Sequence, residues 1–461
     1  MLAEAERVRG RDRLARLPTQ SRLRDYELRY GLELGAGTHG LAHDDADRIA
    51  IEPYPASVRA RRLAVALRFG RTGLGAALTR AARAVALQIE LHLLGNHLLE
   101  NAFALVCAGS AMLGREADAW FRVGSWLLDW QLPEQFLADG GHFERSASYH
   151  LALTHALLET IEIAEASGRG ARAEWRKTAA RALAFASAIR APDGTYPLFN
   201  DAALDAAPAL DAVVAFGRSL GLAPPPPAEQ PATPWLKRLE PTGWILCGAG
   251  DAWLALDAGP DGARWQPGHT HADGLAFELW IAGERVVVDH GVASYGWDAA
   301  RTASRSTRVH NTIELAGLDS CEVWGAFRLG RRGRGFVQHS HVDATAVDLT
   351  LAHDGYQWLG GKPTLRRTLR LEASALTVRD WVEASSGCEP LAFVSRLRFD
   401  AGRFDALRAT GTGSVDRSDG VWFPRLSAPA QAIVLSQESV IGAAPVEWRL
   451  VWGSPVARSF R

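Results

Sequence analysis

The spacing of hydrophobic residues changes once along the chain, from a helical period to an alternating one. Up to about residue 221, apolar positions recur every three or four residues, as in WFRVGSWLLDWQL and LALTHALLETIEIAEA, and this spacing predicts helices. Beyond residue 238, short runs such as WILCGAG and AWLALDAG alternate apolar and polar positions between turn residues, which predicts strands. Helices followed by strands indicate an α+β multidomain protein with separate α and β domains, not an alternating α/β sheet.

A proline-rich tract separates the two patterns. The residues APPPPAEQPATP, 223–234, cannot form the interior of a helix, because proline lacks the backbone donor and clashes with the preceding turn. The tract is typical of a stiff linker. We therefore predict a helical domain over residues 1–222, a linker over 223–237 and a β domain over 238–461. In the β domain, AFELWIAGERVVVDHG predicts a hairpin that turns at Ala282, Gly283 and Glu284.

One predicted helix, residues 84–109, is apolar on most of its surface and should be buried nearly all round. Four polar residues spaced four apart lie along one side of it, and two more lie beside them: Gln88, His92, Asn96, Glu100, His97 and Asn101. Buried polar groups are costly unless each finds a partner or faces water. The stripe indicates either a hydrogen-bond network between core helices or a polar cavity.

A loop rich in glycine precedes another predicted helix. In DGGHFERSASYHLAL, residues 139–153, the glycines predict a loop, and Ser146 or Ser148 is a candidate cap for the helix that follows. Tyr149 would then lie in the first turn of that helix.

Histidines gather near one predicted strand of the β domain. His269 and His271 are two residues apart, a spacing that puts both rings on one face of an extended strand. Two histidines, a distant aspartate and a third histidine form a possible zinc set, because zinc favours tetrahedral nitrogen and oxygen ligands. A cupin would have a glutamate three or four residues after the second histidine, whereas Glu278 comes later. Amidohydrolase-type zinc enzymes place this motif at an early barrel strand, whereas here it follows more than two hundred mostly helical residues.

Composition narrows the classes of protein that fit. The chain has 461 residues, with 51 Lys and Arg against 52 Asp and Glu and a formal net charge of −1, which removes any global attraction to nucleic acid or to an anionic membrane. No window approaches twenty uninterrupted apolar residues, so we expect no membrane span. The four cysteines lack the CxxC spacing of a metal site. The N-terminus lacks the apolar core of a secretory signal, so we expect a cytoplasmic protein as the sequence stands, or a periplasmic or secreted one if a signal has been removed.

Five motifs together resemble the heparinase II/III-like polysaccharide lyases, and they occur in that family's order. They are NHLLENA (96–102), DGGHFERSASYH (139–150), GHTHADGLAFEL (268–279), VVVDHG (286–291) and RSTRVHNTIELAGLDSCEVWGAFRLGRR (305–332). EPYPASVRARRL (52–63) is also similar to that family's early helical segment. The similarity runs from about residue 50 to residue 385. It implies an incomplete (α/α) toroid followed by an antiparallel β-sandwich, with an acidic polysaccharide cleaved by β-elimination at a uronic acid in the cleft between the domains.

The chemistry of β-elimination explains the residue types in these motifs. The C5 proton of a uronate is weakly acidic because the adjacent carboxylate is charged, so donors must neutralise that carboxylate. A base must take the proton and an acid must protonate the leaving O4 oxygen. The resemblance implies that Asn96 and His97 bind and neutralise the carboxylate and that Glu100 tunes or orients His97. It also implies that Tyr149 acts as base and acid, and that His269 assists Tyr149 or takes the proton from the other face of the sugar.

The resemblance also implies further binding roles. A structural zinc would lie on His271, Asp289 and His310, and no organic cofactor would be needed. Arg305 and Arg308 would pair with substrate carboxylates, which guanidinium groups bind bidentately, or would simply be exposed arginines at the sandwich edge. We interpret the tract GRRGRG, residues 330–335, as a solvated loop and not as a sulfate-binding patch.

Two other functions stay open at this stage. One is a zinc-dependent hydrolase that uses His269 and His271 together as ligands of a reactive metal. The other is a non-catalytic polysaccharide-binding or assembly protein. The residues do not assign the sugar, the endo or exo mode of action, or the oligomeric state.

Overall fold

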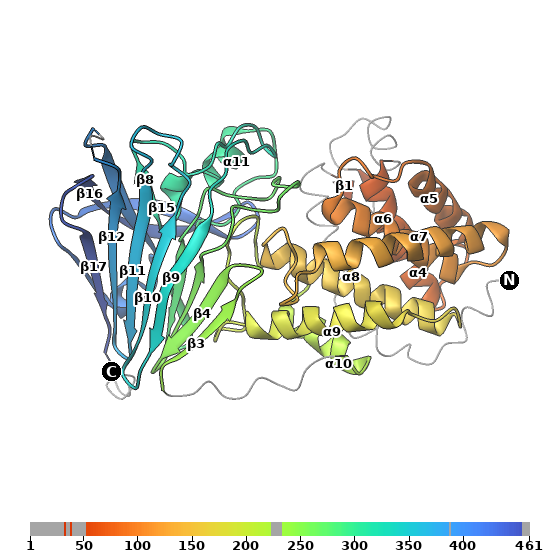
Figure 1. The fold of residues 1–461 in the computed structure, drawn as a ribbon. Coiled ribbons are helices and arrows are strands. Elements are labelled where there is room, and N and C mark those ends of the chain that lie inside the picture. The colour runs from red at the N-terminus through yellow and green to blue at the C-terminus, as the bar shows by residue number, and fades with distance from the viewer. Residues whose placement is uncertain (1–31, 34–36, 39–51, 223–232, 387–388, 454–461) are drawn as a thin grey trace. The chain divides into compact units, whose positions relative to one another are not determined.

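The computed structural model describes residues 32–33, 37–38, 52–222, 233–386 and 389–453, which form two compact units (Figure 1). The first unit holds the helices of the N-terminal half. The second unit holds the strands and also takes in two segments from the N-terminal half, Arg145–Ala147 and Ile189–Leu204. The predicted linker lies mostly outside the described residues. No helix in the described ranges is both long enough and apolar enough to cross a membrane.

Seven helices carry the described part of the helical unit. They are α4 (Pro53–Arg68), α5 (Gly75–Leu87), α6 (Gly95–Ala111), α7 (Arg115–Gln135), α8 (Ala147–Ala166), α9 (Ala173–Ala188) and α10 (Leu210–Ser219); a short pair of strands, β1 (Leu32–Glu33) and β2 (Gly37–Thr38), precedes them. Almost every residue of α6 is buried. Two glycines let α6 and α7 pack backbone to backbone, because a Cβ atom on Gly109 would lie 2.6 Å from the nitrogen of Phe121 and one on Gly124 would lie 2.8 Å from the nitrogen of Val106.

The prediction of one continuous helix over residues 84–109 is wrong. Helix α5 ends at Leu87 and α6 begins at Gly95. The intervening backbone includes Leu94 with φ of 55°, followed by Gly95 with φ of 59°, a left-handed conformation that a right-handed helix does not contain. Gln88 and His92 therefore lie outside both helices and are exposed. Of the predicted stripe, only the part from Asn96 onward lies on a buried helix.

The second unit is an antiparallel β-sandwich in the described part of the chain. One sheet has the order β14-β17-β12-β11-β10-β9, and the other has the order β15-β16-β13-β7-β6-β5-β4-β3 with β8 paired to β13. The strands are β3 (Trp235–Leu239), β4 (Trp244–Ala249), β5 (Ala252–Asp257), β6 (Phe277–Ile281), β7 (Glu284–Val287), β8 (Ile313–Leu315), β9 (Gly335–Val342), β10 (Ala346–His353), β11 (Thr364–Glu372), β12 (Ala375–Glu383), β13 (Ala392–Asp400), β14 (Arg408–Gly411), β15 (Asp416–Arg425), β16 (Ala428–Val440) and β17 (Val446–Val451). Short helices α11 (Ala299–Ser304), η1 (Thr307–Val309) and η2 (Phe404–Ala406) connect some of them.

The sandwich core draws side chains from the facing surfaces of both sheets, among them Leu254, Phe277, Leu349 and Trp448. Strands β11 and β12 show the expected alternation of more and less buried residues, whereas every residue of β4, β5 and β6 is buried. The segment Ile189–Leu204 contacts β4 and β6, where Phe199 packs against Trp244 and Asp193 accepts from Trp280 Nε1 at 2.8 Å.

The predicted hairpin is confirmed, with one adjustment at its turn. Strands β6 and β7 pair with Ile281 opposite Glu284, which leaves Ala282 and Gly283 as a two-residue turn. Both have positive φ, 50° and 82°, as the tight hairpin turn compatible with strand twist requires.

Candidate active site

Asn96 lies at the start of α6 and binds a carboxylate that the sequence did not single out. Its backbone nitrogen donates to Glu144 Oε1 at 3.0 Å, and its side-chain nitrogen lies 3.2 Å from Oε1 and 3.0 Å from Oε2. Glu144 lies three residues before α8 begins and five before Tyr149, which falls in the first turn of α8 as predicted. This contact joins the N-terminus of α6 to the segment that leads into Tyr149. Because an amide has two donor hydrogens, Asn96 can keep one on Glu144 and give the other to a bound carboxylate.

His97 is held by a second carboxylate, Glu90. The distance from His97 Nδ1 to Glu90 Oε1 is 2.8 Å, and the imidazole packs against the ring of Tyr54 with centroids 4.4 Å apart. Asn101 fixes Glu90 in turn, since its amide donates to Oε2 at 3.0 Å and accepts from the backbone nitrogen of Glu90. With Nδ1 engaged and 29% of the side chain exposed, Nε2 is the ring atom left for a substrate.

Glu100 lies in different surroundings from those we predicted. It is fully buried and accepts from Arg61 Nε at 3.3 Å, and Arg61 also pairs with Glu159. A buried guanidinium needs carboxylates to offset its lost hydration, which explains why Glu100 faces Arg61. The carboxylate that contacts His97 in the structure is Glu90, and Glu100 instead contacts Arg61.

The histidine pair of the second unit lies in the loop before β6, so its predicted place on a strand is wrong. Contacts from Asn200 and Asp201 shape this loop. The backbone nitrogen of His271 donates to Asn200 Oδ1 at 2.9 Å, and the carbonyl of His269 accepts from the backbone nitrogen of Asp201 at 3.1 Å. Asn200 also donates from its backbone to Asp273 Oδ2 at 3.1 Å. His269 is itself about nine-tenths buried.

Asp201 is the centre of a buried network. It accepts from His271 Nε2 at 2.8 Å and from both terminal nitrogens of Arg301, with 2.7 Å from Nη2 to Oδ2. All three side chains are fully buried. Burial alone would raise the pKa of Asp201, but Arg301 and His271 hold it well below its usual range.

The same network sets the protonation of His271. Burial lowers the pKa of His271 to about 4, against the opposing effect of Asp201, so the ring is neutral at pH 7. Because Nε2 donates to Asp201, Nδ1 carries the lone pair. That Nδ1 is buried and has no hydrogen-bond partner within the described part of the chain, which leaves a nitrogen ligand available in the sandwich.

A group of possible metal ligands surrounds this nitrogen. Ligand atoms of His271, Asp273 and His310 all lie within 4.8 Å of one another, and all three residues are buried. Asp289 instead lies against His310, 2.9 Å from its Nδ1. Burial alone would lower the pKa of His310, but Asp289 raises it above the ordinary value. The other ring nitrogen of His310, Nε2, lies 3.1 Å from the carbonyl of Ser304, so a metal would have to displace one of the two contacts of this ring. The group of His271, Asp273 and His310 offers the mixed nitrogen and oxygen ligands that a divalent metal takes, and it brings in Asp273, which we did not predict.

Two family comparisons cover most of the chain. The sequence model described as Heparinase II/III N-terminus matches residues 78–216, and the one described as Heparinase II/III-like, C-terminal matches residues 231–448. The chain belongs to the heparinase II/III-like family.

Individual members of the heparinase II/III-like family show how far the likeness extends. A heparin-sulfate lyase of Bacteroides stercoris is 27% identical over 249 residues, which span 50% of this chain and 37% of that protein. A solved heparinase III has a TM-score of 0.69 at 15% identity and covers 88% of this chain and 70% of its own. A heparan sulfate lyase from Pedobacter heparinus has a TM-score of 0.62 at 18% identity, covering 90% and 70%. These structures confirm the predicted fold, an incomplete (α/α) toroid followed by an antiparallel β-sandwich.

The two arginines assigned from the heparinase II/III-like resemblance have different surroundings. Arg305 is fully buried, and its guanidinium donates to backbone carbonyls, among them Thr270 at 2.8 Å and Ala326 at 3.0 Å. It therefore fixes loops, and its predicted pairing with substrate is wrong because its donors are already used inside the fold. Arg308 is exposed, so its substrate-binding role stays a prediction.

Proposed function

We propose that this chain is a polysaccharide lyase that cleaves an acidic polysaccharide at a uronic acid by β-elimination. The relatives named as heparin-sulfate lyase and heparinase III support this reaction class. The observation that carries the proposal is the position of Glu144, which binds Asn96 and lies five residues before Tyr149. The Asn96 amide, a neutral donor, is thereby linked to the segment that carries the Tyr149 phenol.

The proposed division of labour follows from the chemistry of these groups. The amide of Asn96 and Nε2 of His97, which donates when both ring nitrogens carry a proton, would bind the uronate carboxylate, so that negative charge can spread into it as the C5 proton leaves. Glu144 and Glu90 would act as positioning residues that fix these two donors before substrate binds.

Tyr149 would carry the proton. As phenolate it would take the C5 proton, the released electron pair would form the C4–C5 double bond, and the C4–O4 bond would break. The phenol would then return its proton to O4, which balances the reaction without water or a redox partner. His269 would assist Tyr149 or take the proton from the other face of the sugar.

The reaction class can be tested with a panel of uronic-acid polysaccharides. A lyase should generate new ultraviolet absorbance from the unsaturated uronate at the cut end, and a hydrolase generates none. A product with reducing ends but no such absorbance would favour a zinc hydrolase. Affinity with no product from any polymer would favour a binding or assembly protein.

We also propose that a structural zinc binds in the sandwich through His271, His310 and an aspartate. The support is the buried, unpartnered Nδ1 of His271 and the grouping with Asp273 and His310. When bound, the metal would cross-link the HxH loop to the segment before β8, and its binding energy would add to the folding free energy.

The His310→Ala variant should lose zinc and thermal stability together. We expect its melting temperature to fall by about 5 °C or more, since roughly 1 kcal/mol shifts a domain of this size by 2–4 °C. Elemental analysis and melting curves with and without a chelator would check this, and the chelator should shift only the wild type. Asp273→Asn and Asp289→Asn, measured in the same way, would show which carboxylate is the ligand. Wild-type protein without stoichiometric zinc would contradict the proposal.

A further inference from the structure

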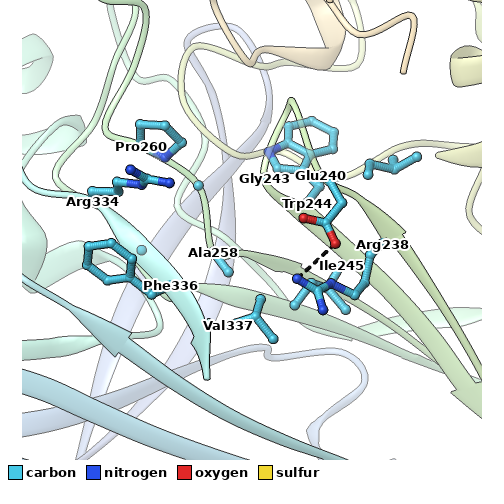
Figure 2. Close-up of a pocket in the computed structure, with 13 residues that line it drawn as sticks. Arg238, Glu240, Gly243, Trp244, Ile245, Ala258, Pro260, Arg334, Phe336 and Val337 are labelled. Carbon is cyan, nitrogen blue, oxygen red and sulfur yellow. Dashed lines mark ion pairs between the residues drawn. The ribbon is translucent and has the colours of Figure 1, made fainter. Parts of the chain in front are cut away.

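A pocket of about 200 Å³ opens on the sandwich, and none of the proposed catalytic or metal-binding residues lines it. Figure 2 shows Arg334 and Phe336 on one side of it, Arg238 on the other, and Ala258 between them. The walls come from the end of β3, the turn into β4, the end of β5 and the start of β9. The volume is below the roughly 300–1,000 Å³ of a whole small-molecule site, so the pocket suits one unit of a chain.

The chemistry of this pocket favours a sugar that carries negative charge. The guanidinium of Arg334 lies over the ring of Phe336, 5.1 Å from its centroid, and both side chains are exposed. Among the described residues, no carboxylate pairs with that guanidinium. Arg238 is paired with Glu240 at 2.9 Å. An aromatic face beside an unpaired guanidinium offers a sugar ring a surface to pack on and offers a carboxylate or sulfate a bidentate partner.

The backbone on either side of Arg334 is closely packed, which changes our interpretation of the tract GRRGRG as a solvated loop. A Cβ on Gly333 would lie 2.5 Å from the Cα of Gly355, and one on Gly335 would lie 2.5 Å from the carbonyl carbon of Ala258. The two glycines are therefore buried against neighbouring backbone, while Arg331 and Arg334 are exposed and the guanidinium of Arg332 donates to the carbonyls of Ala263 and Arg264. Arg331 also lies over an aromatic ring, with its guanidinium 4.2 Å from the ring centroid of the half-exposed Trp358, but it is paired with Glu322 at 3.6 Å.

Arg145, four residues before Tyr149, holds two loops beside the pocket. Arg145 donates from Nε to the carbonyl of Thr242 at 2.9 Å and from Nη1 to the carbonyl of Gly262 at 2.6 Å. Thr242 lies in the turn between β3 and β4, next to lining residue Gly243, and Gly262 follows lining residue Pro260 by two positions. The loops that frame the pocket are thus preorganised for a ligand.

We propose that this pocket is a second binding site for the acidic polysaccharide, in which Arg334 binds the carboxylate or sulfate of one sugar and Phe336 packs against its ring. This inference rests on the proposed function for the identity of the polymer. The site would bind a long chain without taking part in bond cleavage.

Measurements of polymer binding should distinguish the role of this pocket from the role of the catalytic residues. In a Tyr149→Phe background, which prevents turnover, Arg334→Ala should weaken the binding of heparin or alginate about tenfold, the effect expected for one charged hydrogen bond. Affinity electrophoresis at two salt concentrations would measure this, with neutral dextran as the uncharged probe. On the otherwise wild-type enzyme, KM for the polymer should rise by a similar factor while kcat, and both constants for a tetrasaccharide, stay unchanged.

Arg417→Ala is the matched control. Arg417 is also exposed and lies over a phenylalanine ring, 5.1 Å from the centroid of Phe404, but it does not line the pocket. The proposal is overturned if Arg334→Ala binds acidic polymer like its parent, if Arg417→Ala loses as much affinity, or if dextran binds as well as heparin and alginate. If Arg334→Ala loses binding and the wild-type enzyme forms no unsaturated product, the lyase function is refuted and the proposed second binding site is retained.

Discussion

The Tyr149→Phe variant should lose about 10³–10⁴ in kcat while melting close to the wild-type temperature. General acid–base groups contribute about 10²–10⁴ in rate, and a residue that takes one proton and returns it to another atom should reach the upper end. The loss should fall on kcat more than on KM, because the substrate carboxylate rests on Asn96 and His97. The substitution removes one hydroxyl and keeps the ring that packs in the first turn of α8, so the stability cost should be about 1 kcal/mol or less. Steady-state kinetics and melting curves would measure both quantities.

The His271→Ala variant is the comparison that distinguishes the lyase mechanism from metal-dependent hydrolysis. If a reactive metal performed hydrolysis, His271→Ala would abolish turnover and Tyr149→Phe would be mild. The lyase proposal predicts the reverse order in kcat, with the loss in His271→Ala arising through stability. A Tyr149→Phe enzyme that keeps most of its kcat would end the tyrosine mechanism.

Replacing Asp201 by Ala should destabilise the sandwich unit by about 3–5 kcal/mol, the range for removing one partner of a buried ion pair. The fully buried guanidinium of Arg301 would keep its charge without the carboxylate that offsets it. His271 would also lose the acceptor that fixes its tautomer. Chemical denaturation of the purified variant, or its yield of folded protein if unfolding is that severe, would measure the effect.

An exposed pair in the same unit provides the control. Glu383 accepts from Arg366 at 2.8 Å across two strands, with 52% of the glutamate side chain exposed. Glu383→Ala should cost less than about 1 kcal/mol, because water replaces the lost partner. Equal losses of unfolding free energy in Asp201→Ala and Glu383→Ala would show that the buried network stabilises the unit no more than an exposed ion pair does.

Regular features with a local signal could be predicted from the sequence. The change of hydrophobic period separates the helices from the strands, and Ala282 and Gly283 mark the hairpin because a turn needs particular backbone angles there. Tyr149 could be placed at a helix start because serines and glycines precede it. The break between α5 and α6 was missed, because apolar residues continue across it although the backbone leaves the helix from Gln88 to Leu94.

Partners joined across long stretches of sequence could not be predicted. Glu144 lies 48 residues from Asn96, and Asp201 lies 100 residues from Arg301. A single carboxylate in a loop has no periodicity, so nothing local marks it as the partner of a buried donor. Arg305 shows the converse error, since an arginine beside a histidine motif suggests a ligand contact when its donors in fact go to backbone carbonyls.

The inclusion of Ile189–Leu204 in the sandwich unit bears on how this architecture can change during evolution. That segment supplies Asp201 to Arg301, and it supplies the backbone nitrogen of Leu198 and the carbonyl of Tyr196 to the buried pair Glu278 and Arg285. A gene cut at the proline tract would separate these buried charges from their partners. Recombination therefore cannot transfer the sandwich strands by themselves, and a functional exchange between relatives must move the segment between α9 and α10 together with the strands.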